Sequence, residues 1–268
     1  MSIYIITGIP GSGKSYFAVW HMWKNYLHHD SESESIGWKI NEGFQIITNI
    51  EDFDKRVPQS RNISKILDFY NMSYQEFFSM EIQDKITKSD GCLICDKDDD
   101  ENLPQKKDGE KWKIIYFIDE AQSIFGSRYT IENKDTEKDT ALYFQKHRHL
   151  GHTIYLITQD IKLIWTKLWR IAESEIRAVP KHLKIPGFMY YQFRIAGTKT
   201  IEKTKSFPIK KEVFALYKSM DVDESEKVKR PFKMILFFIC IFTAFVQFIF
   251  SEQKSCFTLR QSRTIMVN

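Results

Sequence analysis

Residues 8–15 read Gly-Ile-Pro-Gly-Ser-Gly-Lys-Ser, which is the spacing G-x-x-x-x-G-K-S. Glycines at these positions let the backbone curl so that successive N–H groups face one anion, at the positive end of the following helix. The lysine of such a loop reaches the β- and γ-phosphates, and the next hydroxyl ligates Mg²⁺. The sequence therefore predicts a nucleoside triphosphate site with Lys14 at the phosphates and Ser15 at the metal. The residues expected to contact ATP are Gly8, Ile9, Pro10, Gly11, Ser12, Gly13, Lys14, Ser15 and Tyr16.

The segments on either side of this motif have the character that it requires. Residues 3–7 are mostly apolar and have the length of a buried strand. Residues 15–27 place large apolar side chains, Phe17, Trp20, Trp23 and Leu27, at helical spacing. A strand, a glycine loop and a helix in this order are the context in which the motif binds phosphate, so a chance match is disfavoured.

Two acids, Asp119 and Glu120, follow a second apolar run at residues 114–118. A continuous apolar run is typical of a parallel strand covered on both faces, and ligands bind at the carboxyl ends of such strands. We expect Asp119 to ligate Mg²⁺ and Glu120 to orient or deprotonate the attacking water. The alternative role for Asp119 is to cap the next helix. An adjacent acidic pair favours hydrolysis by water over phosphoryl transfer to a small acceptor.

A third strand is predicted at residues 152–157, and Gln159 lies just beyond it. At the tip of a strand beside the acidic one, Gln159 is a candidate sensor of the γ-phosphate; the alternatives are a helix cap or a surface amide. Arg148 lies in a basic cluster, residues 146–149, at the end of a predicted helix that begins near residue 138. It is a candidate arginine finger for a neighbouring subunit, or a cation that complements the helix dipole.

These segments together resemble the zonula occludens toxin family. The likeness lies in residues 8–15, in residues 114–122, and above all in residues 146–160, where Arg-His-Leu-Gly precedes a strand ending in Thr-Gln-Asp; residues 211–219 resemble the end of the family's domain. It covers roughly residues 1–220. The family includes filamentous-phage morphogenesis ATPases of the inner membrane, on the FtsK/HerA-like branch of P-loop NTPases.

The resemblance implies the fold, the cofactors and the partners. It implies an α/β domain with a mostly parallel central sheet flanked by helices, and it carries the roles above onto Lys14, Ser15, Asp119, Glu120 and Gln159. ATP and Mg²⁺ are the implied cofactors. A homo-oligomeric ring, phage assembly proteins, the inner membrane and the phage DNA complex are the implied partners.

The composition suits a cytosolic α/β domain with attachments. The chain has 268 residues and a net charge of +4, a basic excess too small to identify a nucleic-acid binder. Its four cysteines do not form a disulfide framework, and the pair Cys92 and Cys95 lacks a second pair at zinc-site spacing. No metal beyond Mg²⁺ is expected.

Residues 234–250 contain no charged side chain. As a helix they would extend about 25 Å, close to the ~30 Å of a bilayer core. We expect a cytoplasmic domain at 1–220, a charged linker at 221–231, a transmembrane helix at 232–250 and a short extracytoplasmic tail at 251–268. A buried core helix is the alternative. This orientation follows from the need for cytosolic ATP; no signal peptide is expected. The tail is too short for an independent domain, so no toxin function is inferred.

The remaining segments are expected to complete the domain. Residues 44–49 are predicted to form a strand, residues 62–87 one or two helices, and residues 88–111 a charged surface loop. The stripe Ile161, Ile164, Trp165 and Leu168 predicts an amphipathic helix. Residues 174–209 favour a β-hairpin at the edge of the sheet, whose basic side chains either face a ring pore or DNA, or simply remain solvated.

Three functions are compatible with these features. The favoured one is a membrane-anchored ATPase that drives filamentous phage assembly or extrusion through the inner membrane. The second is a small-molecule P-loop kinase, which the acidic pair and the apolar segment disfavour. The third is a membrane interaction protein or toxin with a vestigial nucleotide site.

Overall fold

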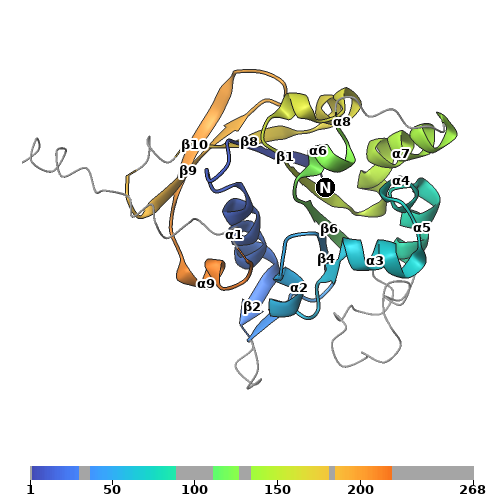
Figure 1. Ribbon diagram of the computed structural model, residues 1–268, viewed down its shortest axis with the longest axis horizontal. Coiled ribbons are helices and arrows are strands. Elements are labelled where there is room, and N and C mark those ends of the chain that lie inside the picture. Colours follow the sequence, from blue (N-terminus) through green and yellow to red (C-terminus); the bar gives the residue numbers. More distant parts are fainter. Residues whose placement is uncertain (1, 30–36, 89–110, 127–133, 181–184, 219–268) are drawn as a thin grey trace, which may run out of the picture. The chain divides into compact units, whose positions relative to one another are not determined.

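The computed structural model describes residues 2–29, 37–88, 111–126, 134–180 and 185–218 (Figure 1). The predicted linker, transmembrane helix and extracytoplasmic tail lie outside the described residues, as does nearly all of the predicted loop at 88–111. Within the described ranges, no helix combines the length and the apolar character that a membrane crossing needs.

An eight-stranded sheet forms the centre of the domain, in the order β10-β9-β8-β1-β7-β6-β4-β5. The strands from β8 to β5 are parallel, whereas β9 pairs antiparallel with both β8 and β10. The predicted mostly parallel sheet is therefore confirmed. The bounds are β1 Ile3–Thr7, β4 Phe44–Thr48, β5 Arg61–Asn62, β6 Lys113–Ile118, β7 Thr153–Ile157, β8 Ser174–Ala178, β9 Phe188–Arg194 and β10 Ile201–Pro208. A separate antiparallel pair joins β2 (Leu27–His29) to β3 (Trp38–Ile40).

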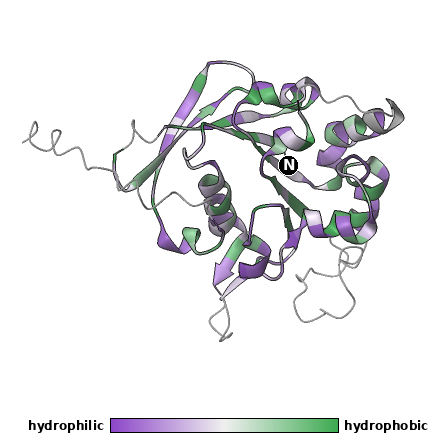
Figure 2. Cartoon of the chain, in the orientation of Figure 1, coloured by the Kyte–Doolittle hydropathy of each residue, from purple (hydrophilic) through white to green (hydrophobic). Residues whose placement is uncertain are grey.

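Helices cover both faces of this sheet (Figure 1). One group packs with α1: it comprises α1 Lys14–Tyr26, α2 Phe53–Arg56 and α9 Lys211–Phe214. The other group comprises α3 Ile63–Tyr70, α4 Tyr74–Phe77, α5 Met80–Lys88, α6 Ala121–Ile124, α7 Lys134–Lys146 and α8 Thr166–Ile171. In Figure 2 the helices carry both hydrophilic and hydrophobic residues, as expected of elements with one buried side.

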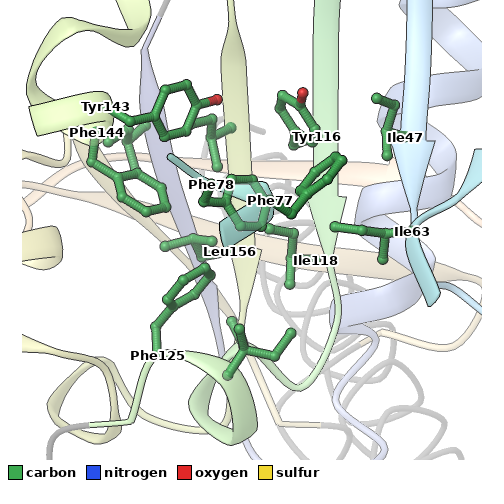
Figure 3. Close-up of a cluster of buried hydrophobic side chains, with 14 of the residues drawn as sticks. Ile47, Ile63, Phe77, Phe78, Tyr116, Ile118, Phe125, Tyr143, Phe144 and Leu156 are labelled. Carbon is green, nitrogen blue, oxygen red and sulfur yellow. The ribbon is translucent and has the colours of Figure 1, made fainter. Parts of the chain in front are cut away.

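Successive residues of the central strands enter two different cores. In β6, Tyr116 and Ile118 pack in the core beneath α3 to α8, while Ile115 and Phe117 pack beneath α1. The first core is rich in aromatic rings, among them Phe77, Phe78, Phe125, Tyr143 and Phe144 (Figure 3). Because both faces are covered, these strands read as continuous apolar runs, which is why the sequence predicted them.

Two predicted elements differ in detail. The residues Ile176–Val179 were expected within an edge hairpin, but β8 is a parallel neighbour of β1, and only β9 and β10 form the hairpin. The single amphipathic helix after Gln159 is instead a short 3₁₀ helix, Ile161–Leu163, followed by α8. The break occurs because Ile164 bridges to Gly126 and the Trp165 N–H donates to the Phe125 carbonyl at 2.7 Å.

Candidate functional site

The glycine motif forms a turn between β1 and α1 with the backbone that a phosphate loop needs. Gly8, Gly11 and Gly13 have φ values of 146°, 68° and 95°. A Cβ on Gly8 would lie 2.6 Å from Ser12 Oγ and 3.0 Å from the Ala178 carbonyl, so only glycine fits there. Helix α1 begins directly after the loop, at Lys14, and its N-terminal N–H groups therefore face the loop.

Lys14 is a largely buried cation at the centre of this loop, with 8% of its surface exposed. Its Nζ donates to the Ile9 carbonyl at 3.5 Å, a long hydrogen bond. Burial lowers the pKa of Lys14, while the charges of Asp119 and Glu120 raise it. Among the described residues no carboxylate forms an ion pair with this ammonium group, so its position suits an anion such as a phosphate group.

The hydroxyl of Ser15 joins the phosphate loop to the acidic strand. Ser15 Oγ donates to Asp119 Oδ2 at 2.9 Å, which brings the two predicted metal ligands together across 104 residues of sequence. Burial raises the pKa of Asp119, and hydrogen bonds from Ser15 and from the Glu120 N–H oppose this rise. A hydroxyl and a carboxylate in contact are the oxygen ligands that Mg²⁺ takes.

Asp119 does not cap the following helix. The N-cap of α6 is Glu120, and Asp119 Oδ1 accepts only from the adjacent Glu120 N–H, at 2.9 Å. The alternative role considered for Asp119 is therefore wrong.

Glu120 lies at the turn between β6 and α6 with a left-handed backbone, φ 48°. Its carboxylate is exposed and accepts a hydrogen bond from the side-chain amide of Gln122. The carboxylate is thus held by a neighbour while remaining accessible to water, as a base for a hydrolytic water should be.

Asn49 was not predicted as a site residue, yet it contacts Asp119 directly. Its Nδ2 donates to the Asp119 carbonyl at 2.9 Å, and its Oδ1 accepts from the Asp119 N–H at 2.6 Å. Asn49 follows β4, the strand that pairs with β6. The signal available in the sequence was a polar residue at the end of the strand predicted at residues 44–49; that this strand lies beside β6 is seen only in the structure.

Gln159 lies at the carboxyl end of β7, and β7 runs between β1 and β6 in the sheet. The Gln159 carbonyl accepts a hydrogen bond from the Gly8 N–H at 3.2 Å, and Gln159 is exposed to solvent. The helix cap in this segment is Asp160, whose side chain accepts from the Lys162 N–H, so Gln159 is not a cap. Its place between the two motif strands supports a sensor, a role that stays a prediction.

Arg148 lies at the amino ends of the parallel strands, whereas the phosphate loop lies at the carboxyl end of β1. It belongs to a 3₁₀ helix, His147–Leu150, that precedes β7, and its guanidinium lies 3.9 Å from Glu173, which precedes β8. Because both strands are parallel to β1, their amino ends are remote from the loop. Arg148 cannot serve the site of its own chain, so an arginine finger would act only on a neighbouring one.

The side chain of Tyr16 turns away from the phosphate loop. Its hydroxyl donates to the Pro208 carbonyl at 3.4 Å and accepts from the Lys210 N–H at 2.9 Å. The ring packs on Phe214 with centroids 4.9 Å apart. Tyr16 therefore holds the α9 segment against α1, and any contact with a cofactor is limited to its backbone.

The residues present fit Mg²⁺-bound ATP. The positive-φ loop, the buried Lys14 ammonium and the Ser15–Asp119 oxygen pair lie at one edge of the sheet, and each matches a different part of that ligand. Among the described residues, no group of three histidine, cysteine or acidic side chains forms a further metal site.

Several solved structures are similar to this chain. The N-terminal domain of zonular occludens toxin from Neisseria meningitidis matches 81% of this chain and 98% of its own length, at 19% identity and a TM-score of 0.49. The genome packaging NTPase B204 from Sulfolobus turreted icosahedral virus 2, in complex with ATP-gammaS, matches 76% and 95%, at 12% identity and a TM-score of 0.41. The DNA-packaging ATPase B204 from Sulfolobus turreted icosahedral virus matches 78% and 98%, at 15% identity and a TM-score of 0.42.

No curated protein matches this chain. The family model described as zonular occludens toxin (Zot) matches residues 2–223. This range spans every described element, from β1 to α9. The chain therefore belongs to the zonular occludens toxin (Zot) family.

Proposed function

We propose that this chain is an ATP hydrolase of the motor type, anchored in the inner membrane, that drives the assembly or extrusion of filamentous phage. The observation that carries the proposal is the 2.9 Å contact between Ser15 Oγ and the Asp119 carboxylate. This contact unites the phosphate loop with the acidic strand in one site. Membership of the Zot family, together with the implied role of its phage ATPases, supports the biological setting.

The residues of the site divide the work of hydrolysis. In this proposal Lys14 binds the β- and γ-phosphates, and Ser15 and Asp119 would hold the metal. Mg²⁺, when bound, neutralises charge on the phosphate oxygens. Glu120, exposed beside Asp119, is the group that accepts a proton from water. Gln159 donates a hydrogen bond toward the terminal phosphate from the tip of β7.

The membrane part of the proposal depends on the sequence alone. Residues 232–250 include the uncharged run, and a charged segment precedes them. A single span there, with the nucleotide site on the cytoplasmic side, gives the motor a fixed position at the point where phage leave the cell. The ring is part of the same proposal: with Arg148 beside Glu173 at the amino ends of the strands, an arginine finger would have to act on the site of a neighbouring subunit.

Turnover of ATP by the full chain in detergent, with no acceptor added, is the first test. We expect steady phosphate release that Lys14→Ala lowers at least about 100-fold, while Glu120→Gln binds ATP but loses turnover by about 10²- to 10⁴-fold. Lys24→Ala is the matched control, because Lys24 lies on the same helix over the Trp20 ring, 5.1 Å from its centroid. Turnover that requires a small acceptor would identify a kinase instead.

Phage release by cells carrying Lys14→Ala tests the biological role. Loss of release supports the motor, and release at the normal level favours the interaction protein or toxin. Membrane fractionation and the mass of the Glu120→Gln protein with ATP test the anchor and the ring. A protein that stays in the soluble fraction, or one that remains a monomer with ATP, would contradict the respective part of the proposal.

A further inference from the structure

The β9–β10 hairpin contacts the phosphate loop directly, although Tyr191 of the hairpin and Gly13 of the loop are 178 residues apart in the sequence. The side chains of Met189 and Tyr191, both on β9, lie against Gly13. A Cβ built on Gly13 would meet the Met189 sulfur at 3.1 Å and the Tyr191 hydroxyl at 3.3 Å. The hairpin is therefore packed so closely on the loop that a methyl group on Gly13 would require these side chains to shift.

The Tyr191 hydroxyl also bonds the loop. It donates to the Gly13 carbonyl at 2.9 Å, and the same carbonyl accepts the Phe17 N–H, the first hydrogen bond of α1, at 3.0 Å. Two donors thus fix the direction of one carbonyl. Because the peptide is planar and trans, the N–H of Lys14 must point the opposite way from this carbonyl. Fixing the Gly13 carbonyl consequently aims a loop N–H at the place of the phosphates.

Tyr191 is itself held firmly from the hairpin side. It is fully buried, with its ring centroid 4.6 Å from that of Phe17 and 5.9 Å from that of Phe207 on β10. Phe207 in turn packs on Trp20 of α1, with ring centroids 4.0 Å apart and ring planes tilted by 32°. Burial raises the pKa of Tyr191 well above its ordinary value, so the phenol stays a donor throughout the working pH range.

We propose that Tyr191 is a positioning residue for the phosphate loop, and that through it the β9–β10 hairpin and the bound phosphates stabilise each other. The inference rests on the proposed nucleotide binding. It adds that the hairpin, which is the antiparallel extension of the sheet, is part of the nucleotide site. Since coupling between two sites is reciprocal, ATP must order the hairpin to the same extent that an ordered hairpin favours ATP.

The test compares Tyr191→Phe with Tyr190→Phe in the full chain. Phenylalanine keeps the ring of Tyr191 and removes only the hydroxyl. Tyr190 is the matched control, because it is the preceding residue on β9 and its side chain points to the opposite face of the sheet. A second control, Tyr143→Phe, removes a buried hydroxyl that bonds His152 at 3.0 Å in the other core.

We expect the Kd and the KM for ATP to rise by about threefold to tenfold in Tyr191→Phe, the size of one net hydrogen bond. We expect kcat to change by less than about twofold, because the bond aids binding in both ground and transition states. Both control variants should keep the Kd of the unmodified chain. A purely structural role would lower the melting temperature of Tyr191→Phe and leave its Kd unchanged.

Hydrogen exchange supplies the reciprocal measurement. ATP should slow amide exchange in β9 and β10 of the unmodified chain, and should slow it less in Tyr191→Phe. If Tyr191→Phe and Tyr190→Phe show the same Kd and the same protection, the inference is wrong while nucleotide binding stands. If the unmodified chain does not bind ATP at all, the proposed function and the inference both fall.

Discussion

Asn49 holds the backbone of Asp119 at both of its polar groups, accepting its N–H at 2.6 Å and donating to its carbonyl at 2.9 Å. The main-chain ladder between β4 and β6 ends at the pair Thr48 and Phe117. The Asn49 side chain continues the pairing beyond that end. Asn49 thereby sets the position of the Asp119 carboxylate, which accepts a hydrogen bond from Ser15 Oγ.

Asn49→Asp should therefore weaken the metal site. Aspartate keeps an acceptor for the Asp119 N–H but loses the donor to the carbonyl, and it adds a negative charge. We expect the Mg²⁺ concentration at half-maximal ATP turnover to rise about 10- to 100-fold, as for other residues that orient metal ligands. Asn62→Asp is the control, because Asn62 caps α3 as an acceptor only, a role that aspartate also fills. Equal Mg²⁺ requirements in the two variants would contradict a positioning role for Asn49.

Gly8→Ala should disrupt the phosphate loop. The new Cβ would lie 2.6 Å from Ser12 Oγ and 3.0 Å from the Ala178 carbonyl, in a backbone with φ 146°. We expect a loss of unfolding free energy of about 1 to 3 kcal/mol from overpacking and a loss of measurable ATP binding. Gly187→Ala is the control, since that glycine also has a positive φ, 88°, but no atom lies within 4 Å of its Cβ position. Melting curves and ATP titrations of both variants provide the comparison; normal ATP affinity in Gly8→Ala would refute the assigned loop geometry.

Arg148→Ala should lower turnover without lowering ATP binding. The exposed 3.9 Å contact with Glu173 contributes little to stability, so the variant should fold normally. As a finger for a neighbouring site, the lost guanidinium should reduce kcat by about 10³-fold or more. Arg170→Ala, in which the removed guanidinium lies 5.9 Å from the Trp169 ring centroid, is the control.

Mixing experiments show whether Arg148 acts between subunits. Subunits with Glu120→Gln keep Arg148, and subunits with Arg148→Ala keep an intact site. A mixture of the two should hydrolyse more ATP than the sum of the separate proteins. Turnover equal to that sum would exclude action on a neighbour.

Acid should destabilise the domain through the buried His152 and the partly buried His21. Burial lowers the pKa of His152 to about 3 and that of His21 to about 4. The ring nitrogens of His152 bond the hydroxyls of Thr87 at 2.9 Å and Tyr143 at 3.0 Å. In the unfolded chain a histidine takes up its proton near pH 6.5. The folded state binds that proton less readily, so stability is complete above pH 6.5 and falls as the pH drops toward the folded values.

Urea unfolding at pH 7.5 and pH 5 measures this effect. At pH 5, proton uptake by each of these histidines in the unfolded chain should lower the free energy of unfolding by about 2 kcal/mol. In His152→Gln the difference between the two pH values should shrink by about that amount, whereas His28→Gln, at an exposed residue, should leave it unchanged. An undiminished pH dependence in His152→Gln would show that this imidazole is not the group responsible.

The strands and the phosphate loop were readable in the sequence because their signals are local. Residues 114–118 are apolar without interruption since each faces one of two cores, and the motif at residues 8–15 is contiguous. Lys14, Ser15, Asp119 and Glu120 were predicted as site residues in this way, and the structure brings Ser15 and Asp119 into contact. An edge hairpin within residues 174–209 was predicted in part: β9 and β10 form it, whereas β8 is a parallel strand beside β1.

The contacts between segments remote in the sequence could not be predicted and are seen only in the three-dimensional structure. Asn49 and Asp119 are 70 residues apart, and Tyr191 and Gly13 are 178 apart. The residues that precede and follow Asn49 or Tyr191 in the sequence do not indicate the partner of either one. Which strands lie side by side is a property of the whole sheet. The break of the predicted helix at Ile164 has the same origin, since a bridge to Gly126 overrides a local helical pattern. The sequence can therefore identify the side chains that are candidates for chemistry. The residues that hold those side chains in place are identified only from the packing of the folded chain.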